Sequence, residues 1–398
     1  MLTLVLSIPL LTNFFGSALN FVAETTTYST YAIYGSVALC FALKYRLNGK
    51  QFYFFVMLTS VVLGLFLINR IVFPESFPYL YMNRPVLMRE LIFYYPSAYA
   101  MAAVDDWSHF FRYMRFTAFW TPFLCWIALT YFKLLDIINY MHLSNALLPG
   151  FLVSWYIVRI YNEKKYYIPA IFSLYLQLMY GGRMSFASGL IFVVLVEIIF
   201  VQENEAALKV IKVSFLSLCV ILGIVYYKNV LEIFVYFLES MNVESRTIRN
   251  IVNGTIFESK TRDAIYKNAW YEMKNMGTGM YGLFGDRLAL EKYYPMHGYT
   301  SNYVHNFFYE MILSFGWILG SFLSVGIVLK IIKGLLFKGN FEKRIMVAYF
   351  VCLIFMRLLV SSSFLIEGQF LFLLGILFNK TESVENDVKE KSVQNNIP

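Results

Sequence analysis

The stretch from Ile312 to Leu329, ILSFGWILGSFLSVGIVL, contains no charged side chain. A helix that crosses the hydrocarbon core of a bilayer needs about 20 consecutive, predominantly apolar residues. Apolar runs of this kind recur along most of the 398 residues, of which 59% are hydrophobic and only 15% charged. A soluble domain carries about 25% charged residues. The sequence therefore predicts a polytopic membrane protein and excludes a soluble enzyme, a secreted domain and a nucleic-acid-binding protein.

We predict an all-α fold with about twelve transmembrane helices and one long external loop. The predicted spans are 2–20, 28–44, 52–73, 86–104, 117–135, 145–160, 166–181, 184–202, 208–227, 303–330, 345–362 and 364–379. Spans one to nine form a bundle over 1–227, the external loop covers 228–302, and spans ten to twelve occupy 303–379. The polar tail 380–398 is predicted to be disordered.

Lysine and arginine are concentrated in alternate short loops, such as 44–50, 159–165 and 330–344. Cytoplasmic loops carry this excess in membrane proteins, so the pattern predicts that both termini are cytoplasmic. The same loops account for most of the net charge of +8. The charge therefore gives no reason to expect a nucleic-acid partner.

The external loop is too apolar to be disordered. Its residues Ile265, Ala269 and Met273 recur at helical spacing, which predicts a short amphipathic helix on the outer face of the bundle. Four glycines then mark a turn-rich passage: Gly277, Gly279, Gly282 and Gly285. Loops of this length are usually functional unless they are disordered, so we expect the chemistry here.

Several motifs of cofactor and metal chemistry are absent from the sequence. It holds no Walker A loop, no HExxH, no DxD and no pair of histidines at metal-ligand spacing. The four cysteines lie within apolar segments and read as small buried side chains. We therefore predict neither a metal nor a cofactor.

Five arginines are candidates for binding an anion at the outer face: Arg183, Arg246, Arg249, Arg262 and Arg357. Planar guanidinium groups bind phosphates in bidentate fashion, so the set suits a lipid pyrophosphate. Each also has a simpler interpretation. Arg183 and Arg357 can extend to the membrane interface, or Arg357 can pair with Glu367. Arg246 and Arg249 can form the solvated face of a loop helix.

His305 lies where the external loop enters the tenth span. With Ser301 or Asn302 as the helix N-cap, it falls in the first helical turn, where the helix dipole disfavours the imidazolium cation. A neutral imidazole suits a general base, although an interfacial histidine bonded to a loop carbonyl is the equal alternative. Glu310 can pair with Asn306 or with one of the arginines.

Residues 305–310, HNFFYE, followed by Gly316 and Gly320, resemble the HN-x-x-x-E…G…G element of the O-antigen polymerase and ligase superfamily. Residues 262–270, RDAIYKNAW, which lead into the glycine-rich turn, are similar to the external-loop pattern of that superfamily. The segment 182–185 resembles its arginine corner before a central span. The order of these motifs and the position of the long loop also match, so the resemblance covers most of the chain.

The resemblance implies a metal-independent glycosyltransferase of the C type in the bacterial inner membrane, with its active site facing the periplasm. Its substrates would be undecaprenyl-pyrophosphate-linked oligosaccharides, and a chain-length-regulating co-polymerase would be a possible partner. By resemblance, His305 activates the acceptor hydroxyl, while Arg183 and Arg262 hold the departing pyrophosphate. Arg246, Arg249, Arg357, Asn306 and Glu310 complete the substrate-binding set.

Three other functions stay open at the level of sequence. A ligase that transfers glycan to lipid A core shares the same chemistry and differs only in its acceptor. A lipid-linked oligosaccharide flippase would place its charges deep within spans and have short external loops, unlike this chain. A scaffold for a polysaccharide assembly complex is the third alternative. Aromatic residues near the loop, such as Trp270 and Tyr303, fit either sugar stacking or an interfacial belt.

Overall fold

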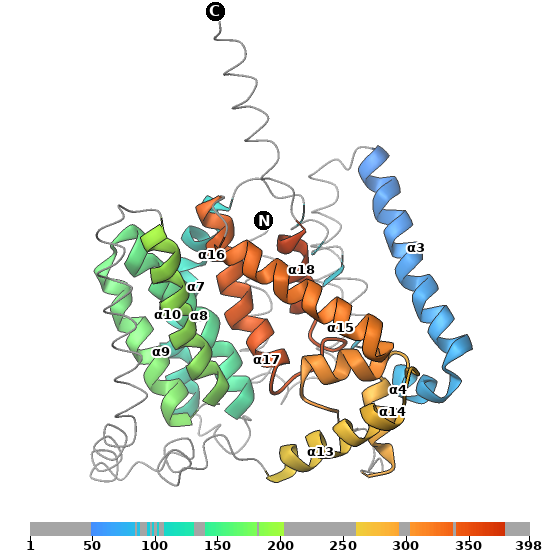
Figure 1. Cartoon of the computed structure of the whole chain (residues 1–398). Coiled ribbons are helices and arrows are strands. Elements are labelled where there is room, and N and C mark those ends of the chain that lie inside the picture. The colour runs from blue at the N-terminus through green and yellow to red at the C-terminus, as the bar shows by residue number, and fades with distance from the viewer. Residues whose placement is uncertain are drawn as a thin grey trace, which may run out of the picture. The chain divides into compact units, whose positions relative to one another are not determined.

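The structure is a computed structural model, shown in Figure 1. It describes residues 49–83, 86–87, 94–95, 98, 102, 107–130, 140–180, 183–202, 260–293, 303–336 and 340–378. Every regular element among these residues is a helix, which confirms the all-α prediction for the described part of the chain. The chain forms two compact units, one of Met1–Thr30, Asp106–Glu258 and Arg344–Leu353 and the other of Tyr31–Asp105, Ser259–Lys343 and Ile354–Pro398.

In the first unit, α7 (Ser108–Thr130), α8 (Tyr140–Tyr161), α9 (Tyr167–Tyr180) and α10 (Arg183–Gln202) pack against one another (Figure 1). Arg159 of α8 and Glu197 of α10 form a two-point ion pair at 2.5 and 3.1 Å. The rings of Phe111 and Tyr156 stack at 3.8 Å between α7 and α8. Most of α16 (Phe341–Phe350) also belongs to this unit.

In the second unit, α3 (Gly49–Val72) turns sharply into the 3-10 turn η1 (Pro74–Ser76) and α4 (Phe77–Met82). The two arms meet at an angle of 106°. The external-loop segment supplies α13 (Lys260–Asn275) and α14 (Gly285–Glu291), which pack against the long helix α15 (Phe307–Leu336). A π-helical turn (Val351–Phe355) begins in the first unit and leads into α17 (Met356–Leu358) of the second unit, and α18 (Gln369–Leu377) follows.

The tenth span differs from the prediction in one physical respect. It was expected as a continuous helix over 303–330, but α15 begins at Phe307 and its helical backbone is interrupted at Gly316, where φ is 79° and ψ is 170°. The interruption releases the carbonyls of Leu313 and Ser314 from the helix. They accept hydrogen bonds of 3.0 and 3.1 Å from the backbone N–H groups of Tyr281 and Gly282. The docked glycine-rich turn thus satisfies the backbone that the break exposes.

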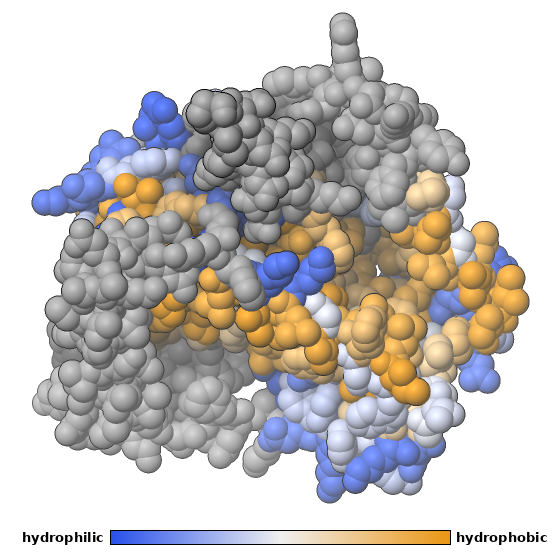
Figure 2. All heavy atoms as spheres, turned by 45° about the horizontal axis from the view of Figure 1, so that its top comes forward, coloured by the Kyte–Doolittle hydropathy of each residue, from blue (hydrophilic) through white to orange (hydrophobic). Residues whose placement is uncertain are grey.

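Within the described residues, two helices are long and apolar enough to cross a membrane, Leu143–Tyr161 and Phe307–Leu336. The bent pair Thr59–Val72 and Pro74–Met82 makes a third if it is a single broken span. Figure 2 shows hydrophobic side chains over much of the described surface on one face, with hydrophilic side chains at its margins. These helices indicate a membrane protein.

The other predicted spans have mixed outcomes. Spans 2–20, 28–44 and 208–227 and most of 86–104 lie outside the described residues. The span predicted over 117–135 corresponds to α7, which begins earlier, and the last predicted span contains only the 9 residues of α18. The predicted boundaries of the external loop, at residues 227 and 302, depend on where the membrane surface lies. They stay a prediction.

Candidate functional site

The first component of the site is the predicted amphipathic helix of the external loop, which the structure contains as α13. Ile265, Ala269 and Met273 are all buried, in a core shared with α14 and α15. The indole Nε1 of Trp317 donates to the backbone oxygen of Met273 at 2.8 Å. This packing fixes the side of α13 that carries Tyr266 against the start of α15, where the rings of Tyr266 and Tyr309 meet at 5.8 Å.

Glu272 holds together the connection from α13 to α14. Its buried carboxylate accepts hydrogen bonds from the hydroxyls of Tyr293 at 2.6 Å and Tyr281 at 3.2 Å, and its Oε1 lies 2.6 Å from Nζ of Lys292. The hydrogen bond to Glu272 raises the pKa of Tyr293, whereas burial is the main cause of the raised pKa of Tyr281. These contacts join α13 to both ends of the segment from the glycine-rich passage to the end of α14.

That passage docks on the bend between α3 and η1. The backbone N–H of Leu283 donates to Oδ1 of the buried Asn69 at 2.7 Å, and Nδ2 of Asn69 donates to Ser76 at 3.2 Å. Gly282 has a φ of 80°, and a Cβ there would lie 2.5 Å from Oδ1 of Asn69. Only glycine combines this backbone conformation with so close an approach. The turn-rich passage predicted from four glycines is therefore observed, and it directs the chain into α14.

The charged residues Asp286 and Arg287 of α14 are completely buried, with side chains 0% and 1% exposed. Nη1 of Arg287 donates to Oδ1 of Asp286 at 3.0 Å, and its guanidinium carbon lies 5.2 Å from the ring centre of Tyr303. Oδ2 of Asp286 accepts a hydrogen bond of 3.1 Å from the backbone N–H of Val304. Burying an ion pair is costly unless further hydrogen bonds satisfy it, so this pair is a specific feature of the fold.

Sequence reasoning did not single out Asp286 or Arg287. Only their position directly after the glycine-rich passage, at the start of a short helix, marks them in the sequence. Phe284, at the N-cap of α14, adopts a left-handed φ of 60°. The left-handed conformation of Phe284 directs the chain into α14, whose first residues are buried.

His305 is not in the first turn of a helix, as the sequence suggested with Ser301 or Asn302 as N-cap. The helix α15 begins at Phe307, and Oδ1 of Asn306 accepts from the N–H groups of Phe308 and Tyr309 at 3.0 and 3.2 Å. Asn306 therefore caps the helix. His305 precedes the cap with a φ of 53°.

The imidazole of His305 is enclosed on several sides. The ring of Tyr303 lies 3.9 Å from it, centre to centre, and the hydroxyl of Tyr266 donates to the His305 carbonyl at 3.3 Å. The imidazole also hydrogen-bonds the backbone of Ser361. Nδ1 is buried and has no partner among the described residues. A neutral imidazole that donates to a carbonyl through Nε2 has Nδ1 as its acceptor atom.

Burial and, second, the positive charge of Arg262 lower the pKa of His305 to about 4, while the bond to Ser361 and the charge of Asp286 oppose the shift. A neutral imidazole was predicted from the helix dipole. The cause in the structure is desolvation together with the charge of Arg262. At neutral pH the imidazole is therefore uncharged, as a general base must be before it takes a proton, and a pKa of about 4 makes it a weaker base than a free imidazole.

Glu310 lies in the first turn of α15 and is buried. Its carboxylate accepts hydrogen bonds from the hydroxyl of Ser363 and from the backbone N–H of Phe364, the latter at 3.1 Å. Oε1 lies 3.9 Å from Nη1 of Arg287. Arg287 is not one of the five arginines singled out in the sequence, so the predicted arginine partner is not the one observed. The pairing with Asn306 is not observed either, because the Asn306 oxygen caps α15.

Arg357 has the partner that the simpler interpretation gave it. Its Nη2 lies 2.8 Å from Oε2 of Glu367, and the hydroxyl of Ser362 donates to the same oxygen at 3.0 Å. These contacts hold the turn that carries Ser361 and Ser363. Tyr303 reaches the same turn, because its hydroxyl donates to the Ser361 carbonyl at 2.9 Å.

The predicted site residues therefore have three outcomes. Five lie in the second unit, in segments that contact one another: Arg262, His305, Asn306, Glu310 and Arg357. Arg183 is the first residue of α10 in the first unit. Arg246 and Arg249 lie outside the described residues. Across the described ranges, no group of three or more histidine, cysteine, aspartate or glutamate side chains is placed to hold a metal ion.

Comparison of the chain with models of known protein families, with curated proteins and with solved structures gives no match.

Proposed function

We propose that this chain is a metal-independent glycosyltransferase that polymerises lipid-linked oligosaccharide repeat units at the outer face of the bacterial inner membrane. The observation that carries the proposal is the imidazole of His305. It is held neutral, with Nδ1 unbonded among the described residues, beside the positive charge of Arg262. The resemblance of 305–310 and 262–270 to the O-antigen polymerase and ligase superfamily supports the same reaction.

In the proposed reaction, Nδ1 of His305 takes the proton of a hydroxyl at the non-reducing end of the acceptor repeat unit. The acceptor oxygen then bonds to the anomeric carbon of the growing glycan, and the bond from that carbon to undecaprenyl pyrophosphate breaks. The leaving group keeps the electron pair as an anion. Arg262 and Arg183 are proposed to stabilise it, each at about 2.7–4 kcal/mol by analogy with oxyanion donors.

The proposal includes a bundle of about twelve spans, cytoplasmic termini, and Arg246, Arg249 and Arg357 as further contacts to pyrophosphate or glycan. Arg357 already pairs with Glu367, so its role would require that pair to open or to share its donors. Asn306 and Glu310 are also proposed as contacts to pyrophosphate or glycan, although the Asn306 oxygen caps α15 and Glu310 accepts a hydrogen bond from Phe364.

A glycan gel from a deletion strain tests the proposal. The strain is complemented with the wild type, with His305→Ala, with Arg262→Ala and with Lys267→Ala, an exposed position on the same helix as Arg262. We expect lipid A core bearing one repeat unit in the deletion strain, and a ladder restored by the wild type and by Lys267→Ala only. Loss of the general base should reduce the rate about 10²–10⁴-fold.

Other patterns on the same gel would replace the proposal. Lipid-linked polymer outside the cell, with no repeat unit on the core, identifies a ligase. Single lipid-linked units retained on the cytoplasmic side identify a flippase. A full ladder from His305→Ala and Arg262→Ala, with each variant present in the membrane, would exclude this active site.

A further inference from the structure

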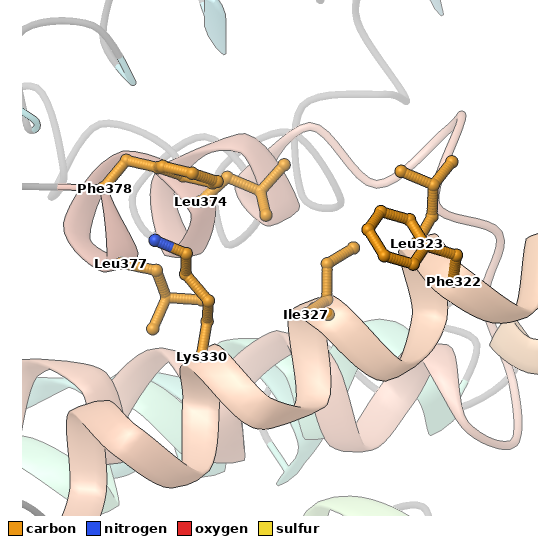
Figure 3. Close-up of a pocket in the computed structure, with 8 residues that line it drawn as sticks. Phe322, Leu323, Ile327, Lys330, Leu374, Leu377 and Phe378 are labelled. Carbon is orange, nitrogen blue, oxygen red and sulfur yellow. The ribbon is translucent and has the colours of Figure 1, made fainter. Parts of the chain in front are cut away.

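An apolar groove runs between the C-terminal half of α15 and the end of α18, far along the chain from His305 (Figure 3). Its volume is about 170 Å³, and its walls include the side chains of Phe322, Ile327, Leu374 and Leu377. The groove lies on the more apolar of the two described helices that are long enough to cross a membrane, and Phe322 at its edge is 73% exposed. Its position favours a hydrocarbon ligand.

Among the described residues that line this groove, Lys330 is the charged one. Figure 3 shows its side chain extending from α15 toward Phe378, and Nζ lies 4.3 Å from the centre of that ring. Among the described residues, no carboxylate forms an ion pair with it. Lys333 lies three residues further along α15 and is exposed, on a neighbouring part of the helix surface.

We propose that the groove binds an acyl chain of an anionic phospholipid of the bilayer, whose phosphate contacts Lys330. A lysine close to the end of a spanning helix extends its amine to the level of the lipid headgroups. Two neighbouring lysines with no ion pair to a carboxylate of the described residues attract anionic headgroups over neutral ones. The groove is too small to enclose a whole helix, which with its side chains is about 10–12 Å wide. The inference is independent of the proposed glycosyl transfer.

Gly326 allows the groove to be filled without disturbing the fold. It lines the groove, and a Cβ built on it meets no atom within 4 Å. Gly326→Leu therefore projects a side chain into the space that the acyl chain would occupy. Gly64 in α3 is a matched control, because a Cβ there also meets nothing within 4 Å.

The test uses the full-length protein in detergent and native mass spectrometry. Phosphatidylglycerol and phosphatidylcholine with identical acyl chains are added separately, and the bound lipid is counted. We expect the wild type to retain phosphatidylglycerol about fivefold more than phosphatidylcholine. Lys330→Gln should abolish the preference, and Lys330→Arg should keep it. Gly326→Leu should reduce the retention of both lipids, and Gly64→Leu should leave it unchanged.

Equal retention of the two lipids by the wild type would overturn the proposal, as would an unchanged preference in Lys330→Gln. Retention of both lipids by Gly326→Leu at the level of the wild type would show that the acyl chain lies elsewhere. The Lys330 variants change only an exposed side chain, so they keep the test decisive even if Gly326→Leu folds poorly.

Discussion

Oδ2 of Asp286 lies 3.1 Å from the backbone nitrogen of Val304, the residue directly before His305, and accepts its hydrogen bond. The other carboxylate oxygen of Asp286 accepts a hydrogen bond from Arg287. The guanidinium of Arg287 lies over the ring of Tyr303, the residue before Val304. A buried ion pair on α14 thus contacts both residues that precede His305. Neither charged side chain is exposed. They act on the site through the backbone and ring that they contact, and through opposing effects of their charges on the pKa of His305.

Asp286→Ala should destabilise the protein more than removal of any exposed acid. It leaves Arg287 buried with Glu310 at 3.9 Å as its remaining carboxylate, and breaking a buried pair costs about 3–5 kcal/mol. Asp286→Asn should cost less, because the amide oxygen can still accept from Val304. Thermal unfolding in detergent measures the difference. Asp263→Ala, exposed on α13, is the control, and an equal effect of both alanine variants would contradict the assigned role.

The amphipathic helix α13 was predictable because its burial follows a local rule. Ile265, Ala269 and Met273 are spaced for one helical face, and that face is the buried one. The glycine-rich turn was predictable for a similar reason. Gly277 and Gly282 both adopt positive φ, which other residues resist.

The pair of Asp286 and Arg287 was not predictable, because its burial depends on contacts with distant segments. The contacted residues Val304 and Glu310 lie later in the chain, beyond the end of α14. Nothing in the local sequence distinguishes this buried pair from the exposed charges of the loop. The break at Gly316 is also a tertiary effect. The carbonyls that it frees are satisfied by a turn more than thirty residues earlier in the chain, and the apolar pattern of α15 continues through it unchanged.

The stability of the site should decrease as the pH falls from about 6.5 to about 4. Burial and Arg262 lower the pKa of His305 from 6.5 to about 4, so over this interval the unfolded chain binds a proton that the folded chain does not. The free energy of unfolding therefore rises with pH between these values and is constant above them. The contribution is at most about 3 kcal/mol, and thermal unfolding across pH 4–8 measures it.

His305→Asn should remove this part of the pH dependence. Arg262→Gln should shift the decrease to higher pH, since the positive charge of Arg262 is the second cause of the lowered pKa. Arg262→Lys keeps the charge and should resemble the wild type. If the wild type and His305→Asn respond identically to pH, the imidazole is not buried as described.

Glu272→Ala should loosen the connection between α13 and α14. The hydroxyls of Tyr281 and Tyr293 and the amine of Lys292 would all lose the carboxylate that joins them, at a cost of about 1–3 kcal/mol for the partner groups left unsatisfied. Amide hydrogen exchange should become faster across 276–293. Glu272→Gln retains two hydrogen-bond acceptor sites and should show a smaller effect. Equal exchange in Glu272→Ala and Glu272→Gln would contradict a role for the hydrogen bonds from Tyr281 and Tyr293.

Two glycines of the same helix, Gly316 and Gly326, should respond in opposite ways to alanine. Gly316 has φ of 79° and ψ of 170°, a conformation that costs other residues about 1–3 kcal/mol, and a Cβ there would lie 3.0 Å from the oxygen of Gly279. Gly326 is helical with open space around it, so alanine should stabilise α15 by about 0.5–1 kcal/mol. Thermal unfolding of the two variants compares them directly. A Gly316→Ala variant as stable as Gly326→Ala would mean that α15 is an unbroken span and that the glycine-rich turn docks elsewhere.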